Sequence, residues 1–200
     1  MELTDLQPIQ EWIAFERRLC EIFNVDANVF NTRGIRISDH KVWKNKLCPA
    51  IKATDKGQSF ICAVAHMNIA AISQNTRKPA VEECDAGLAK IVVPIIVDDT
   101  FIGAVGSCGV MREDGEVESF LVNKITEIDE NEVDRLSEGI PTISQEKIDA
   151  LIAFVQKEID AIVENYKKKE GCHEDQSKRY QHQLCVIRAG FLSGFDSRVQ

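Results

Sequence analysis

The pattern of apolar and polar positions predicts helices at both ends of the chain and strands in the middle. Between residues 4 and 23, apolar side chains recur every three or four positions, which indicates a helix with one buried face. These positions are Leu6, Ile9, Trp12, Ile13, Leu19, Ile22 and Phe23. From 28 to 37, two β-like triplets flank the turn residues 31–34, so the sequence predicts a β-hairpin there.

Helical spacing returns in three later segments. Trp43, Leu47 and Cys48 predict one face of a helix between Asp39 and Pro49. Residues 58–75 contain neither glycine nor proline, and their apolar stripe consists of Phe60, Ile61, Val64, Ala65, Ile69 and Ile72. Short helices are expected over residues 118–137.

Extended structure is predicted between residues 80 and 106. Three β-like runs cover residues 80–84, 91–97 and 101–106, and the turn at 98–100 makes the last two an antiparallel hairpin. Pro94 indicates an edge or a bulge. Gly103, Gly106 and Gly109 lie within and just after a strand, so we interpret them as bulges or close backbone contacts rather than as a phosphate-binding loop.

A long helix is predicted after residue 143. Ser144 is its expected cap, because Gln145-Glu146-Lys147 follows and an apolar stripe then begins at Ile148. The stripe consists of Ile148, Leu151, Ile152, Val155, Ile159, Ile162, Val163 and Tyr166. We therefore expect a domain over residues 1–143 and a C-terminal helix over 144–170 that either forms a dimer, links to another domain or packs on the same core. Periodicity stops after Gly171, so residues 171–200 are expected to be a poorly ordered tail.

Composition narrows the classes of function. With a net charge of −8, the sequence does not predict the basic surface that binds nucleic acid. No apolar run approaches the roughly 18–20 residues that span a bilayer. The first residues lack the basic and apolar blocks of a signal peptide, so we expect a cytoplasmic protein. In that reducing compartment, the chain's seven cysteines point to metal binding, redox sensing or plain burial rather than to disulfides.

Four of the cysteines, Cys48, Cys62, Cys84 and Cys108, lie in the segment with the clearest motifs. Their separations of 14, 22 and 24 residues match no zinc-finger or ferredoxin pattern. If the fold brings them together, their thiolates are suitable ligands for iron, zinc or an iron–sulfur cluster. The alternatives are an apolar pocket lined by reduced thiols and simple packing. Packing is our interpretation of Cys20, and Cys172 and Cys185 fall in the tail.

The same segment resembles the PocR sensory-domain family in four ordered motifs. They are Cys48-Pro49-Ala50-Ile51, the single Cys62, Cys84-Asp85-Ala86-Gly87-Leu88 and Pro94-Ile95-Ile96-Val97. The resemblance spans about residues 5–160 and implies an α+β, PAS-like or GAF-like antiparallel sheet flanked by helices. It also implies a sensor of small molecules, with diols proposed for the family, that acts on an output module.

The resemblance, together with the positions of Cys108, Trp43 and Met67 in the chain, suggests a set of site residues. The family's histidine after the third cysteine is Asp85 in this chain, and His66 is the available imidazole. We expect Cys48, Cys62, Cys84 and Cys108 as metal ligands for an iron–sulfur cluster or zinc, or otherwise a small organic effector bound with Trp43, His66, Met67 and Asp85. Expected partners are that effector, an output signalling protein or domain in trans and a second copy of the chain. We recognise no set of residues typical of an active site. The alternative to a sensor is a small redox or metal-dependent enzyme with a reactive Cys84.

Overall fold

The computed structural model describes the backbone of residues 1–192 and the side chains of residues 1–170. Contacts group the chain into two compact units, Met1–Asp160 and Ala161–Gln200. The first unit contains the sheet, the helices that pack on it and the first turns of the long C-terminal helix.

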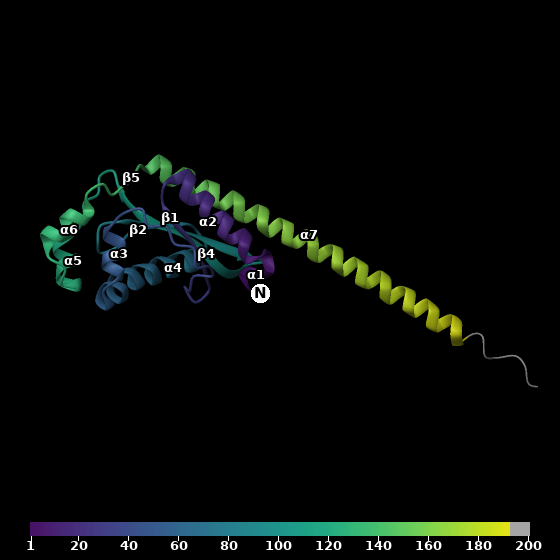
Figure 1. Ribbon diagram of the computed structural model, residues 1–200. Helices are drawn as coiled ribbons and strands as arrows, with labels where there is room; N and C mark the ends of the chain where they lie inside the picture. The colour runs from purple at the N-terminus through teal and green to yellow at the C-terminus, as the bar shows by residue number, and fades with distance from the viewer. Residues whose placement is uncertain (193–200) are drawn as a thin grey trace, which may run out of the picture. The chain divides into compact units, whose positions relative to one another are not determined.

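The sheet is antiparallel apart from a short parallel extension at one end (Figure 1). Its order is β1-β4-β3-β2, and β5 pairs in parallel with Met111 and Arg112 at the end of β4. The strands are β1 (Asp26–Asn31), β2 (Ala80–Glu83), β3 (Ala89–Val97), β4 (Thr100–Arg112) and β5 (Thr142–Ile143). An α+β fold with an antiparallel sheet and a long C-terminal helix is thus confirmed.

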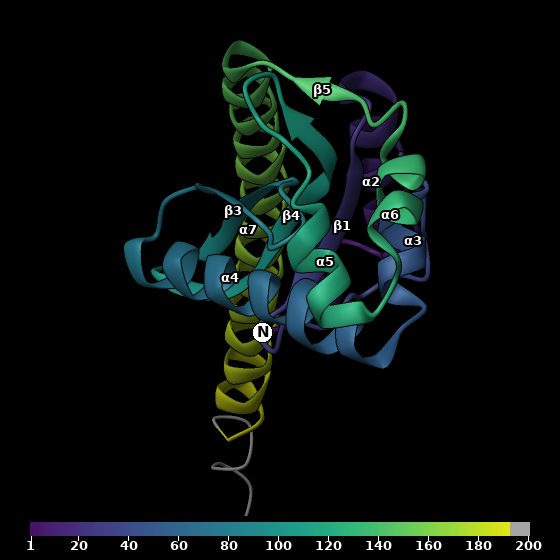
Figure 2. The same ribbon diagram turned by 90° about the vertical axis from the view of Figure 1, so that its left-hand side faces the viewer.

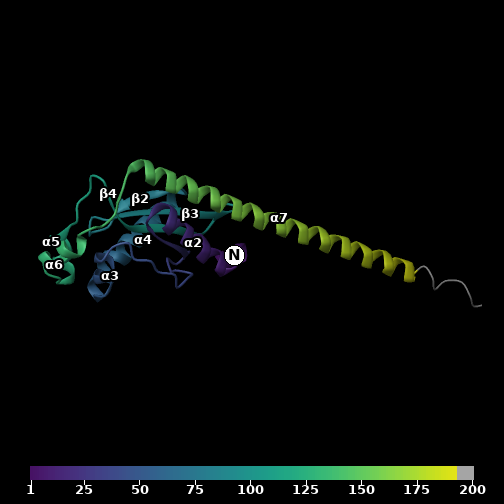
Figure 3. The same cartoon turned by 45° about the horizontal axis from the view of Figure 1, so that its top comes forward.

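Helices cover both faces of this sheet. They are α1 (Leu3–Leu6), α2 (Ile9–Phe23), α3 (Leu47–Lys52), the π-helix η1 (Gly57–Ala63), α4 (Val64–Thr76), α5 (Ser119–Thr126), α6 (Glu130–Ser137) and α7 (Gln145–Leu192). Figures 1 and 3 show α2 and the start of α7 on one side of the sheet, with α3 and α4 on the other. Figure 2 shows α5 and α6 beside α3 at one end of the sheet.

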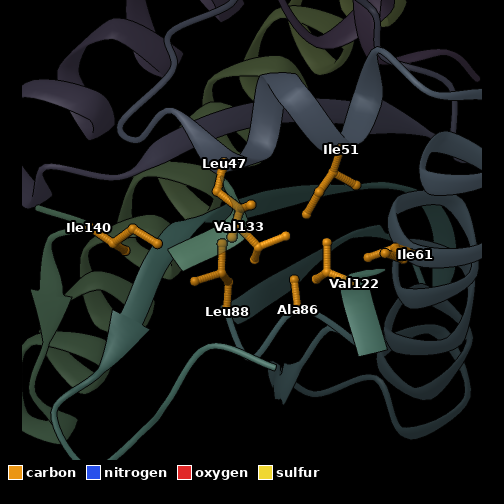
Figure 4. Close-up of a cluster of buried hydrophobic side chains, with 8 residues drawn as sticks. All are labelled: Leu47, Ile51, Ile61, Ala86, Leu88, Val122, Val133 and Ile140. Carbon is orange, nitrogen blue, oxygen red and sulfur yellow. The ribbon is translucent and has the colours of Figure 1, made fainter. Parts of the chain in front are cut away.

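Two buried clusters hold the α3 and α4 side in place. Ile69 of α4 packs with Ala80, Val92 and Ala104 of the sheet. A larger cluster joins α3, η1, α5 and α6 to the turn after β2, and Figure 4 shows these side chains converging. Its members are Leu47, Ile51, Ile61, Ala86, Leu88, Val122, Val133 and Ile140.

Several helix predictions require correction. The first helix is two helices, because Pro8 begins α2 as its N-cap residue. The helix expected from Asp39 begins only at Leu47, and Trp43 precedes it with 40% of its surface exposed. In the 58–75 stripe, Phe60 and Ile72 are exposed rather than buried. The cause is η1, because a wider π turn rotates less per residue and shifts the phase of the stripe.

The strand predictions are mostly confirmed. The expected hairpin is reduced to one isolated bridge between Phe30 and Arg36, and residues 35–37 form no strand. Strand β3 pairs with β2 only as far as Val92. Pro94 lies beyond this point, where the edge of β3 is open and the lack of an N–H donor costs no ladder hydrogen bond. Gly106 has a close neighbour, since an added Cβ would lie 2.9 Å from the Phe30 ring. The sequence did not predict β5.

The helix α7 begins as expected, with the Lys147 amide donating to Ser144 Oγ at 3.2 Å. Its first turns bury Ile148, Leu151, Val155 and Ile159. An edge-to-face contact between Phe23 and Phe154 joins these turns to α2, as does an ion pair between Arg18 and Glu158. The backbone stays helical to Leu192, and the side chains of the predicted tail, 171–200, lie outside the described residues. No helix in the described part of the chain is long and apolar enough to cross a membrane.

Candidate functional site

A cavity of about 380 Å³ lies between the sheet and the segment from α3 to α4. Its floor includes Asp26 and Asn28 of β1, which stand directly opposite Cys108 and Gly106 of β4 and therefore share their face of the sheet. Its walls come from the loop after β1, from α3, η1 and α4, and from the start of β3. Such a volume is typical of a small-molecule pocket.

All four of the predicted cysteines, Cys48, Cys62, Cys84 and Cys108, line this cavity. They come from α3, from η1, from the residue after β2 and from β4, so only the tertiary fold brings them together. None is fully exposed, and all are free thiols. Cys20 is buried elsewhere and does not line the cavity.

Asn45 fixes the position of Cys48 relative to the sheet. Its Oδ1 accepts a 2.7 Å hydrogen bond from the Cys48 amide at the start of α3. Its Nδ2 donates to the Gly109 carbonyl of β4 at 2.8 Å, and it also lies 3.4 Å from Cys48 Sγ. One side chain thus ties two thiol-bearing elements together, a contact between distant segments that sequence patterns do not reveal.

The η1 helix places Cys62 against the cavity. Gly57 begins η1, and there is no space for a Cβ there because the Ile51 carbonyl and the Thr54 side chain occupy it. This close approach lets η1 pack on α3. Single π turns occur frequently at functional sites, and this one carries three lining residues, Gln58, Cys62 and Ala63.

Burial keeps most of these thiols protonated. It raises the pKa of Cys48, Cys62 and Cys108 above the ordinary value for a thiol. For Cys48, the neighbouring Cys108 adds to this effect, while the Asn45 hydrogen bond opposes it. Because the thiolate is the nucleophile, these three sulfurs are poorly suited to nucleophilic attack in this arrangement. The alternative of an enzyme with a reactive Cys84 stays a prediction.

Among the described side chains, no three His, Cys, Asp or Glu residues are grouped so that they could hold a metal ion. Zinc and iron–sulfur clusters need several thiolates at bonding distance. These cofactors stay predictions.

Three of the four predicted ligand-binding residues lie at the cavity. Trp43, His66 and Met67 line it, whereas Asp85 is exposed in the turn after β2 and does not. The His66 ring contacts Phe30, with centroids 4.0 Å apart, and its Nε2 is buried without a hydrogen-bond partner. Burial, followed by the charge of Lys90, lowers the pKa of His66 to about 4, so the ring is neutral at pH 7.

The polar floor of the cavity was missed by the sequence analysis. Asp26 and Asn28 are only 3% and 4% exposed, and one side-chain oxygen of each has no hydrogen-bond partner in the described part of the chain. Burial raises the pKa of Asp26 to about 6, against the lowering effect of Arg36, Lys44 and Lys52. Polar residues at alternate positions of a strand were the available signal, because they form a polar stripe on a face that the helices then cover.

Comparison with known families agrees with this architecture. An α+β fold with a partly polar cavity against its sheet is an arrangement suited to a domain that binds small molecules. The model of the sensory domain found in PocR matches residues 3–166, and the chain therefore belongs to that family. No curated protein and no solved structure shows a significant match to the chain.

Proposed function

We propose that this chain is a sensor that binds a small organic effector in the cavity and passes the bound state to α7. The single observation that supports this most strongly is the cavity itself, in a domain whose family is sensory. The four thiols then serve as a reduced, weakly polar lining. An output protein or domain in trans would read the state of α7.

The route from the cavity to α7 is short. Strand β4 contributes residues 106–109 to the lining and ends three residues later, where Arg112 pairs with Ile143 of β5. Arg112 Nη2 also donates to Gln145 Oε1, at the first residue of α7, at 3.2 Å. A ligand that favours one position of β4 therefore shifts the start of α7, provided that its affinity differs between the two states.

Thermal unfolding of the purified chain with short alcohols and diols tests effector binding. We expect a saturable rise in the melting temperature, because a ligand that binds only the folded state stabilises it. The variant Ala63→Phe fills the cavity from η1 and should abolish the rise, whereas Ala70→Phe on α4, outside the lining, should keep it. Equal responses of the two variants would contradict binding in this cavity.

Metal analysis after anaerobic purification separates this proposal from the metal hypothesis. We expect iron and zinc well below one equivalent per chain and no thiolate–iron absorption. A stoichiometric metal that is lost on Cys48→Ser would instead support a metal sensor. A cytoplasmic location belongs to the same proposal, because the five described cysteines are free and a reducing compartment keeps them so.

A further inference from the structure

We infer that the effector is a small hydroxylated carboxylate. Its hydroxyl group would be recognised at the floor of the cavity, formed by Asp26 and Asn28, and its negative charge at the basic rim, which consists of Arg33, Arg36, Lys52 and Lys90. The inference rests on the proposed function and deepens it by naming a ligand class. Two independent features support it, the unpartnered acceptors of β1 and an excess of cationic side chains.

The floor requires hydrogen-bond donors. Asp26 Oδ1 and Asn28 Oδ1 are both buried without a hydrogen-bond partner among the described residues, and the two residues lie two positions apart on one face of β1. A buried unsatisfied polar atom costs free energy, so such a pair in a cavity points to a group that donates to it. Both atoms are acceptors, and a ligand hydroxyl is a suitable donor.

The lining carries far more positive than negative charge. Among the residues that the structure describes, four cationic residues line the cavity, Arg33, Arg36, Lys52 and Lys90, and the only acidic one is Asp26. Within the described residues, none of these four cations lies within 4 Å of a carboxylate. In a chain of net charge −8, this local excess attracts anions and disfavours an ammonium group on the ligand.

Aromatic side chains hold two of these cations at the cavity. Lys52 Nζ lies 5.1 Å from the centroid of the Trp43 ring, and the Arg36 guanidinium lies 6.0 Å from that of Phe30. A second hollow beside the cavity shares Arg36, Trp43, Lys52 and Gln58 and adds Lys41. The positive region therefore extends outward from the cavity, which suits a carboxylate at the rim.

Apolar side chains of the lining would contact the carbon skeleton of the ligand. Phe30, Leu88, Ile91 and Val92 also line the cavity, so a carbon chain would find apolar contacts between the polar floor and the basic rim. The expected ligand thus combines a hydroxyl group, a short apolar skeleton and one carboxylate.

Matched compounds test the two recognition elements separately. The probes are lactate, propionate and propane-1,2-diol, and the same three types of compound on a 4-methylpentane skeleton, with binding measured by calorimetry. We expect at least one hydroxy acid to bind about tenfold or more tightly than both its carboxylate and its diol, because each comparison removes one strong contact.

Charge-removing variants identify the rim. Lys52→Gln combined with Lys90→Gln should weaken hydroxy acid binding by about tenfold or more, and by a larger factor than it weakens diol binding. The control is Lys46→Gln, which removes the same charge from an exposed residue beside α3 that does not line the cavity, and it should bind normally.

The outcomes distinguish the inference of a hydroxylated carboxylate from the proposal that the chain is a sensor. Diols that bind more tightly than the hydroxy acids, with no effect of the lysine variants, would overturn the carboxylate inference and leave the sensor proposal standing. Failure of all six compounds to bind the folded chain would overturn the inference and also remove the support that this cavity gives to the sensor proposal. A loss of binding in Lys46→Gln equal to that in the double variant would contradict a role for the rim.

Discussion

At the scale of single residues, the site depends on polar groups buried at some cost in stability. Asp26 is a carboxylic acid at 3% exposure, and Gly109 beside it has a φ of +83° in the strand opposite. Both residues belong to the lining. A buried polar group that reduces folding stability but shapes a pocket is typical of a functional site, whereas glycine adopts a positive φ without strain.

The raised pKa of Asp26 predicts a pH-dependent loss of stability. The folded state holds this proton up to a pH of about 6, whereas the unfolded chain releases it near 3.8, so stability falls as the pH rises through this window. The full effect is about 3 kcal/mol. In Asp26→Asn the effect should be absent, so the variant should gain stability relative to the parent between pH 4 and 7 in urea unfolding.

The quantity to compare is the difference in the free energy of unfolding between Asp26→Asn and the parent, because Glu16 and His66 have shifted pKa values in both proteins. The cations that lower the pKa of Asp26, namely Arg36, Lys44 and Lys52, are also present in both. A pH-independent difference would show that Asp26 titrates normally in the folded protein.

Gly109 should tolerate alanine less well than Gly139 does. Both glycines have positive φ, but a Cβ on Gly109 would lie 2.8 Å from Asp26 Oδ2, whereas one on Gly139 would meet nothing within 4 Å. We expect Gly139→Ala to lower the free energy of unfolding by about 1 kcal/mol and Gly109→Ala by about 1–2 kcal/mol more. Urea unfolding measures both, and equal losses would exclude the contact with Asp26.

At the scale of elements, the cavity depends on polar contacts that connect one helix or strand to another. Asn45 ties α3 to β4, and Arg112 ties β4 to the first residue of α7. In η1 the backbone departs from the α-helix where three residues of the lining lie. The cavity and its route to α7 thus depend on a small number of polar contacts.

The cap of α7 should contribute measurably to stability. Ser144→Ala removes the acceptor of the Lys147 amide, so we expect a loss of about 1 kcal/mol in the free energy of unfolding. Ser137→Ala is the control, because its hydroxyl donates to the Val133 carbonyl inside α6 and caps no free amide. A loss in Ser137→Ala as large as that in Ser144→Ala would argue against capping as the cause.

At the scale of the whole molecule, the first turns of α7 belong to the core of the unit Met1–Asp160. Four of their apolar side chains are at most 2% exposed, namely Ile148, Leu151, Val155 and Ile159. The family match ends at residue 166, after this buried stripe. Dimerisation through the later part of α7 stays a prediction.

Truncation should show where the folding unit ends. A chain that stops after Tyr166 keeps the buried stripe and should melt within a few degrees of the full chain, as judged by circular dichroism. A chain that stops after Ser144 loses the four side chains, each worth about 1.5–3 kcal/mol when buried, and should not fold stably. A stable fold in the shorter chain would show that α7 is not part of the core.

The sequence by itself determined most of the elements and the family. Alternation and helical spacing located β3, β4 and the start of α7, because these patterns follow from local geometry. The ordered motifs around Cys48 and Cys84 indicated the family that the match over residues 3–166 confirms. These features are local, so neighbouring residues suffice to reveal them.

Only the tertiary structure decided what surrounds the cysteines. Pairing of β1 with β4 brings Asp26 opposite Cys108, although 82 positions separate them in the sequence. The hairpin after β1 and the end of α3 then place Arg36 and Lys52 at the same cavity. Burial and charge excess are properties of residues that meet in space, and no spacing along the chain records them. The four cysteines that the sequence singled out therefore line, in the folded chain, a pocket that also contains buried polar groups and an excess of cationic side chains.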